Sequence, residues 1–525
     1  MASGAREGLG PRVPLLFAVP TPDCGELMST VPARFPSLAG RAHAVPRAAL
    51  WVLAAVVLGV GVGLAAALQQ TAIAVAILLL PALVVLLLHP DWLPPVLVAA
   101  AFGEAIKTGS ITVSRFVGPL AVVTMVLALP ARKRLRLTRV GVLSAVLAYS
   151  AWALASALWT VNPDSSFHQN GGGYALASLA LSIVFMLGII MFVQREYELR
   201  RLAIVVWCFS VGVGLVAIVQ YLSGYTRSLG LSGDANFFAA VQVVAIPVEA
   251  VLVSQVNSTR MRAIVLVGLA VTVGSVMTSL SRGGILTLAV AFLLLSIQPA
   301  SAFFRTRARK RAFMLVAAVG GAILLIATYS ALSARTSSLF TTADGGSGRT
   351  NLWLAAVQGW HQHPLLGMGF GAFVGQSDQL LLTTPGVDFS AYALRPTGQF
   401  VHNAYLESLT ELGPIGLALF LGILVTTAAT LLSTARRAAR AGAMFLSSFA
   451  RALLVSLAAF AFASLFLSSE TDRALWILLG LAVVLPGVLT EEQRRHQASY
   501  AANASHASAT VLSSGDGPPD PSSGV

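Results

Sequence analysis

The polar chemistry of this chain is concentrated in one long segment at 331–412, which contains Arg349 and the string HNAYLE at 402–407, in a protein otherwise built almost wholly of apolar runs. A histidine that titrates near neutral pH can take a proton from a hydroxyl group, so His402 is a candidate general base. Asn403 or Glu407 can orient it. Helical spacing predicts a helix that begins at His402, with Glu407 and Glu411 on its polar side. The alternative for His402 is a capping or packing role.

Two arginines, Arg282 and Arg349, lie in segments that are predicted to leave the membrane. A guanidinium group is a planar fork that suits bidentate contact with phosphate. Arg282 lies in a tight turn, SRGG at 281–284, where the glycines would let a bulky head group approach the backbone. Arg349 precedes an amphipathic helix predicted at 351–360 against the bilayer and capped by Thr350, and its N-terminus would also favour an anion. The alternatives are lipid contact for Arg282 and a solvated loop for Arg349.

Two polar pairs lie at the ends of predicted spans. Asp234 and Asn236 occupy the outer mouth of a span, where they could cap a helix or face a substrate. Glu470 and Asp472 precede the last span and are expected to be solvated.

Two further strings resemble known motifs only superficially. His361 and His363 have no third ligand at a suitable spacing, so we expect a solvated turn rather than a metal site. The glycine-rich string at 367–371 lacks the Lys-Ser/Thr of a phosphate loop, and we expect it to be a flexible return loop.

The composition indicates which class of protein positions these residues. Of 525 residues, 56% are hydrophobic and only 10% are charged, which is typical of a polytopic membrane protein. The net charge of +13 is carried by short loops between apolar runs, so it indicates topology rather than binding of nucleic acid.

Apolar runs long enough to span a bilayer predict an all-α fold with about 12–14 transmembrane helices. The run at 93–106 is short and contains Pro94 and Pro95. The predicted spans lie at 48–68, 71–88, 93–106, 116–130, 140–158, 173–193, 202–222, 235–254, 263–279, 284–299, 312–330, 413–433, 447–469 and 473–490.

Most of the 34 basic residues fall in the tails and in alternate loops, which predicts that both termini are cytoplasmic. The long loop then faces away from the cytoplasm, where nucleotide sugars are absent, so a donor would have to be membrane-delivered and pre-activated. The predicted layout is a disordered cytoplasmic tail (1–47), transmembrane helices (48–330), an extracytoplasmic catalytic loop with short helices (331–412), transmembrane helices (413–490) and a second disordered cytoplasmic tail (491–525).

Taken together, these strings resemble the O-antigen ligase and O-antigen polymerase superfamily of bacterial membrane glycosyltransferases. The resemblance covers about residues 230–430, whereas the first 200 residues contribute only a helix count. In chain order, the strings that carry it are Asp-Ala-Asn at 234–236, Ser-Arg-Gly at 281–283, Gly-Arg at 348–349 with Trp353, PLLGMG at 364–369, HNAYLE at 402–407 and ELGPIG at 411–416.

The resemblance implies a GT-C-type fold in which the large loop covers a cavity open to the outer leaflet of the bacterial plasma (inner) membrane. It implies that His402 is the base, that Arg282 and Arg349 bind the diphosphate of a polyprenyl-linked glycan donor, and that Arg395 is a third candidate. In-line attack by a glycan or glycolipid acceptor would invert the anomeric carbon without a metal or cofactor. The supporting residues would be Asn403, Glu407, Asp234, Asn236 and Ser281.

Two other functions remain open. A transporter or flippase of polysaccharide or lipid-linked glycan would place charged residues near the membrane midplane, whereas these spans are almost free of charge. A peptidoglycan-polymerising relative would need an outer acidic residue, for which Asp234 or Glu407 is the candidate. Neither the acceptor nor the sugar is specified by the sequence, and ligase and polymerase share these motifs.

Overall fold

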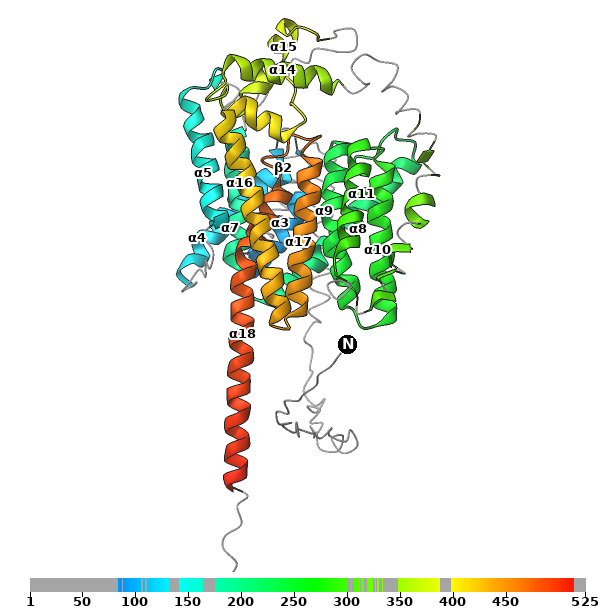
Figure 1. Ribbon diagram of the computed structural model, residues 1–525, viewed down its shortest axis with the longest axis vertical. Helices are drawn as coiled ribbons and strands as arrows, with labels where there is room; N and C mark the ends of the chain where they lie inside the picture. Colours follow the sequence, from blue (N-terminus) through cyan, green and yellow to red (C-terminus); the bar gives the residue numbers. More distant parts are fainter. Residues whose placement is uncertain are drawn as a thin grey trace, which may run out of the picture.

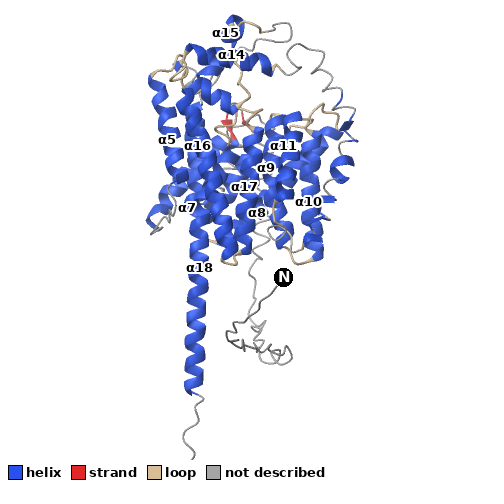
Figure 2. Cartoon of the chain, viewed as in Figure 1, coloured by secondary structure: helices blue, strands red, loops and turns tan. Residues whose placement is uncertain are grey.

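The computed structural model describes most of residues 84–513, which form a bundle of α-helices (Figures 1 and 2). The N-terminal tail, the predicted span 48–68 and Arg395 therefore lie outside the described residues. Within 84–513 the residues not described are 87, 105–106, 109–110, 132–140, 164–174, 334–347, 388–397 and scattered positions between 300 and 333.

The described helices follow the predicted spans closely. Two two-residue strands, β1 (Lys107–Thr108) and β2 (Ile111–Thr112), pair as an antiparallel ribbon. The α-helices are α3 (Leu93–Phe102), α4 (Val113–Ala128), α5 (Gly141–Ala155), α7 (Ala175–Phe192), α8 (Glu196–Leu222), α9 (Ala235–Gln255), α10 (Thr259–Thr278), α11 (Arg282–Ile297), α14 (Arg349–Gln362), α15 (Ala372–Thr383), α16 (Ala404–Arg440), α17 (Met444–Ala463) and α18 (Arg473–Ser513). Short 3-10 helices lie at Pro90–Trp92, Leu129–Ala131 and Ser156–Leu158.

Among the described residues, eight helices are long and apolar enough to cross a membrane, so the chain is an all-α multi-pass membrane protein. They are α5 with the turn that follows it, α7, α8, α9, α10, α16, α17 and α18. Helices α4 and α11 are apolar but have 16 residues each. Helix α3 has ten residues, with prolines in its first turn. The total of 12–14 spans stays a prediction, because the first predicted span lies outside the described residues.

The two ends of the bundle are distinguished by the helix ends that meet there. At one end, Arg200 at the start of α8 donates to Gln255 at the end of α9, at 3.4 Å. At the other end, the N–H of Ala404 donates to the carbonyl of Ser464, at 2.9 Å. Helices α14 and α15 lie across this second end, whereas α18 projects far beyond the first (Figure 1). The predicted loop helices and the basic loop at 195–201 are thus on opposite ends, as the charge pattern requires.

Helix α18 corrects one expectation about the C-terminus. We predicted a disordered tail from residue 491, but the helix continues to Ser513. Its side chains from Gln493 to Ser499 are exposed, and ion pairs of Arg495 with Glu491 and of His496 with Glu492 lie along its surface. The extension is therefore a solvated helix over the part that the structure describes.

Helix α16 bends at Gly413, the residue that separates its loop part from its membrane part. Gly413 has φ 68° and ψ −173°, which is not helical. Pro414 follows and has no N–H to donate to the carbonyl of Thr410, four residues earlier. The bend therefore frees the backbone carbonyls of the preceding turn, at Thr410, Glu411 and Leu412.

The segment at 367–371 binds two of these freed carbonyls, Trp152 of α5 binds the third, and the segment is not the flexible loop that we expected. In order, the donors are the N–H of Met368 at 3.0 Å, the N–H of Gly369 at 2.8 Å and the indole N–H of Trp152 at 2.9 Å. Gly367 lies so close to α16 that a Cβ on it would be 2.4 Å from the backbone of Glu411. The string is thus a closely packed strap across the bend, which also holds α14 and α15.

Replacing Gly413 by alanine should destabilise the protein. The alanine would have to keep the left-handed φ of Gly413, and its Cβ would lie 2.3 Å from the carbonyl oxygen of Leu365. We therefore expect the free energy of unfolding to fall by roughly 1–3 kcal/mol or more. Thermal unfolding of the detergent-purified protein measures it. Gly422→Ala, in the same helix with open space around its Cβ, is the matched control and should be neutral or slightly stabilising. Equal melting temperatures for the two variants would contradict this account of the bend.

Helices α14 and α15 form a small second core above the bundle. Helix α14 packs against α15 and α16, and its buried Leu352, Ala355 and Ala356 contact the apolar side of α15. Glu411, which we expected on a polar helix face, is buried and accepts from the N–H groups of Gly371 at 2.7 Å and Phe373 at 3.1 Å. The apolar face of α14 is therefore covered by protein, and Glu411 caps α15.

Candidate functional site

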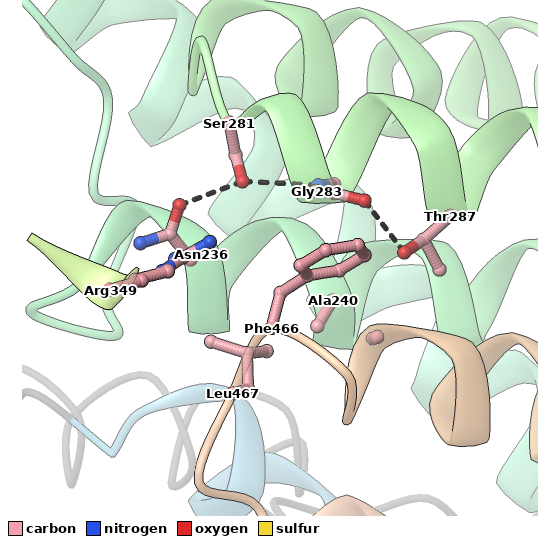
Figure 3. A pocket seen from close by; sticks show the side chains of 10 residues that line it. Asn236, Ala240, Ser281, Gly283, Thr287, Arg349, Phe466 and Leu467 are labelled. Atoms are coloured by element: carbon pink, nitrogen blue, oxygen red, sulfur yellow. Dashed lines mark hydrogen bonds between the residues drawn. The ribbon is translucent and has the colours of Figure 1, made fainter. Parts of the chain in front are cut away.

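The N-terminal ends of three described helices, α9, α11 and α14, meet at a small cavity at the loop end of the bundle (Figure 3). A helix N-terminus carries partial positive charge and unpaired N–H groups, which favour an anion. The residues that line the cavity and bear on its chemistry are Asn236, Ser281, Gly283, Arg349, Phe466 and Leu467.

Asn236 and Ser281 connect α9 to α11. The Ser281 hydroxyl donates to Asn236 Oδ1 at 2.8 Å and accepts from the N–H of Gly284 at 3.1 Å, so it caps α11. Asp234 caps α9 by accepting from the N–H groups of Asn236 at 2.7 Å and Phe237 at 3.0 Å. Asp234 therefore has a capping role, while Asn236 and Ser281 line the cavity.

Arg227, which was not among the predicted site residues, contacts the lining residue Asn236. Its Nη2 donates to Asn236 Oδ1 at 2.9 Å and its Nε to the carbonyl of Ser279 at 3.2 Å. These contacts hold the guanidinium group beside the joined ends of α9 and α11. The available signal was its place among the few basic residues assigned to the outer side, seven positions before Asp234.

Arg349 is the first residue of α14 and lines the cavity, where its side chain extends toward Asn236 (Figure 3). The N-cap of α14 is Gly348, with φ 68°, and not Thr350 as expected. Glycine is suited to this left-handed conformation, which turns the chain into the helix directly at Arg349. The predicted pairing of this arginine with a helix N-terminus is thus present in the structure.

Arg282 is the first residue of α11 and is half-buried, and its Nη1 is buried without a hydrogen-bond partner among the described residues. Arg282 itself does not line the cavity, although Gly283 does. A Cβ on Gly284 would lie 2.5 Å from Ala239, so this glycine serves close packing of α11 against α9. Gly283 and Gly284 both line the cavity, and Gly284 in addition permits the close packing of α11 on α9.

His402 has a left-handed backbone, with φ 56°, an unusual conformation for a residue with a side chain. Its N–H donates to Ser468 Oγ at 3.0 Å, and the Ser468 hydroxyl in turn donates to the buried carboxylate of Glu407. Asn403 caps α16 by accepting from the N–H groups of Tyr405 and Leu406, each at 3.1 Å. Ser468 therefore links Glu407 to the backbone of His402, and Asn403 sets the start of the helix.

The loop between α17 and α18 connects His402 to the cavity. Phe466 and Leu467 line the cavity, and the next residue, Ser468, binds the backbone of His402. His402 itself is not among the lining residues. The structure thus brings Asn236, Ser281 and Arg349 together at the cavity. The backbone of His402 is bound by Ser468, which follows the lining residue Leu467 in the sequence.

Glu470, in the same loop, is buried rather than solvated, with 7% of its surface exposed. Its pKa is raised to about 8, chiefly by burial and also by repulsion from the Glu411 carboxylate, while backbone hydrogen bonds act in the opposite direction. Asp472 is half-buried, and burial raises its pKa to about 6. The expectation of solvated carboxylates here is wrong, because the α17–α18 loop folds inward under the loop helices.

Because folding raises the pKa of Glu470, its contribution to stability should fall as pH rises. The folded state keeps the proton between the ordinary value of 4.5 and about 8, while the unfolded chain loses it. The free energy of unfolding should therefore decline across this window and level off above it. Glu470→Gln should remove part of this decline in melting temperature, whereas Glu492→Gln on the exposed extension should not. Parallel pH profiles for wild type and Glu470→Gln would refute the assignment.

Comparison with known protein families gives one match. Residues 267–421 match the family model described as O-antigen ligase. Curated protein sequences give no match to this chain. The matched segment begins in α10 and ends in α16, so it contains Ser281, Arg282, Arg349 and His402. It confirms over this part of the chain the family resemblance that the motifs indicate.

Proposed function

We propose, on the premise that residues 267–421 belong to the O-antigen ligase family, that this protein is a membrane glycosyltransferase. It transfers or polymerises glycan from a polyprenyl-diphosphate-linked donor onto an acceptor hydroxyl. The observation that carries the proposal is the convergence of Asn236, Ser281 and Arg349 at one cavity between helix N-termini. The reaction takes place at the extracytoplasmic face of the bacterial plasma membrane, with both termini in the cytoplasm.

The cavity suits a diphosphate leaving group. Arg349 supplies a planar guanidinium at its wall, and Arg227 and Arg282 flank the ends of α9 and α11. Fixed N–H groups and guanidinium groups stabilise charge that develops as a leaving group departs. Arg395, outside the described residues, is a further candidate for the same task. With these cations in place, we propose that the transfer proceeds without a metal.

His402 is the proposed base. It removes the proton from the acceptor hydroxyl while the oxygen forms a bond to the anomeric carbon, and the bond from that carbon to the diphosphate oxygen breaks. The electron pair of the broken bond leaves with the polyprenyl diphosphate, whose charge faces the arginines. An attack in line with the leaving group inverts the anomeric configuration.

A second cavity suits the lipid part of the donor. Its walls come from α3, α8, α9, α17 and α18. Apart from Ser456, its lining side chains are apolar, among them Phe102, Val241, Val248 and Leu478. We propose that this groove holds part of the isoprenoid chain while the diphosphate occupies the arginine-lined cavity.

Ser468→Ala should lower the transfer rate about tenfold with little change in KM for the donor, because the N–H of His402 and the Glu407 carboxylate lose the hydroxyl between them. Ser468→Thr should restore most of the rate. The control is Ser433→Ala, whose hydroxyl donates to the Thr430 carbonyl within α16, far from the loop end. A rate equal to wild type in Ser468→Ala would show that the bridge does not position the base.

Product analysis distinguishes transfer from transport. Purified full-length protein is mixed with polyprenyl-diphosphate-linked oligosaccharide and a hydroxyl acceptor, and free polyprenyl diphosphate is measured. A transferase releases it in proportion to the glycan transferred. A transporter or flippase would move the intact lipid-linked glycan across vesicles and release none, which would overturn the proposal.

A further inference from the structure

A carboxyl group lies inside the membrane-spanning part of α9. Glu249 is fully buried, at 0% exposure, although we expected these spans to be almost free of charge. Its Oε1 accepts from the Thr272 hydroxyl of α10 at 3.0 Å. Its Oε2 is buried and has no hydrogen-bond partner among the described residues. An ionisable group at this depth is costly and rare, and it indicates a functional site.

Glu249 ends a chain of polar side chains from three helices. Ser210 of α8 lies 3.1 Å from the Thr272 hydroxyl and donates to Gln242 Oε1 at 2.5 Å. Gln242 Nε2 then donates to Ser275 Oγ at 3.3 Å. All five side chains have 0% exposure. The Ser210–Thr272 contact joins two hydroxyl groups, either of which can be the donor, whereas Gln242 fixes the direction of its own hydrogen bonds.

A second unsatisfied group lies at the same turn of α10. Trp207 Nε1 is buried without a hydrogen-bond partner among the described residues. It packs on Gly268, where a Cβ would lie 2.3 Å from this nitrogen, and the Gly268 carbonyl accepts from Thr272 at 3.2 Å. An indole N–H only donates and cannot ligate a cation. Trp207 therefore adds no metal ligand to this part of the bundle.

No described cation compensates a charge on Glu249. Helices α8, α10, α11 and α17 pack against α9. Arg451 of α17 donates to Gln298 at the end of α11, at 3.2 Å. Cys208 of α8 is exposed. The other titratable or charged side chains on these helices lie in end turns: Glu196, Tyr197, Glu198, Arg200, Arg201, Tyr221, Arg260, Arg262 and Arg282.

We propose that Glu249, with Thr272, Ser210 and Gln242, forms a proton-binding site within the membrane bundle. The ligand is a proton taken from water: an O–H bond forms on Oε2, the carboxylate becomes a neutral acid and hydroxide remains in the solvent. Binding removes an uncompensated charge from an apolar interior. The site goes beyond the proposed glycan transfer and does not depend on it. Asn236, which lines the cavity with Arg349, lies on the same helix, α9. Protonation of Glu249 therefore changes the charge of a helix that contributes to this cavity.

Infrared spectroscopy of the full-length protein in lipid bilayers at neutral pH, in H2O and D2O, tests the site. Wild type should show a carbonyl stretching band of a protonated carboxylic acid that is lost in Glu249→Gln. The band should shift in Thr272→Val, because Oε1 then has no donor. Glu196→Gln, whose carboxylate is paired with Arg200 at 2.6 Å, should leave it unchanged.

Three outcomes would overturn the proposal. Identical wild-type and Glu249→Gln spectra in the acid region would mean that Glu249 is ionised at neutral pH. Disappearance of the band on addition of sodium chloride at constant pH would mean that a metal cation is the ligand. If Glu249→Gln does not fold, a wild-type band that is unmoved in Thr272→Val would show that the acid lies elsewhere.

Discussion

Glycan transfer should fall by about 10²–10⁴-fold in His402→Ala, the range that a general base contributes. The substitution removes the proposed proton acceptor, whereas the contact of the backbone N–H with Ser468 remains possible. The measurement is kcat for transfer from a polyprenyl-diphosphate-linked oligosaccharide by purified protein. KM for the donor should change little, because the diphosphate is held by other residues.

Two further variants make the result specific. His402→Asn keeps a residue that tolerates the left-handed backbone, so it should be equally inactive while its melting temperature stays near that of wild type. His361→Ala, in the last turn of α14 and exposed, should remain active. Normal transfer by a folded His402→Asn variant would remove His402 from the mechanism.

Arg349→Lys should lower kcat on the order of 10²-fold, comparable to the removal of one fixed donor to a developing anion. Lysine keeps the charge but lacks the planar fork that contacts two phosphate oxygens together. Arg349 lines the cavity as the first residue of α14, so the loss should concern transition-state binding more than the fold. Steady-state kinetics with the lipid-linked donor measures it.

Arg282→Lys should also be impaired, because Arg282 presents an unsatisfied Nη1 at the start of α11. Arg436→Lys, near the far end of α16, is the matched control and should behave as wild type. If Arg282→Lys and Arg349→Lys both retain full activity, these arginines are lipid anchors and the cavity is not the diphosphate site.

The membrane helices could be predicted because their length and hydropathy are local properties of the sequence. The meeting of Asn236, Ser281 and Arg349 at one cavity depends on tertiary structure. Each of their motifs nevertheless lies at a helix N-terminus, and these N-termini are at the same end of the bundle. Charge alternation along the chain predicted that shared end. The helices and their end of the bundle could therefore be predicted where local sequence determines local structure.

Other parts of the site depend on contacts that no local string encodes. Ser468 binds the His402 backbone only because the α17–α18 loop folds inward, and the same fold buries Glu470. Arg227 reaches Asn236 through the loop that precedes α9. Glu249 was missed because one carboxyl group in a 21-residue apolar helix leaves the span's mean hydropathy at 2.0.

Binding of polyprenyl diphosphate to the full-length protein tests whether the cavity between α9, α11 and α14 is the diphosphate site. The dissociation constant can be measured by native mass spectrometry of the protein and its variants with the lipid. We expect wild type and Arg436→Ala to bind polyprenyl diphosphate with equal affinity, and Arg349→Ala to bind it at least tenfold more weakly. Equal affinity in Arg349→Ala would contradict the assignment of the cavity between α9, α11 and α14 as the diphosphate site.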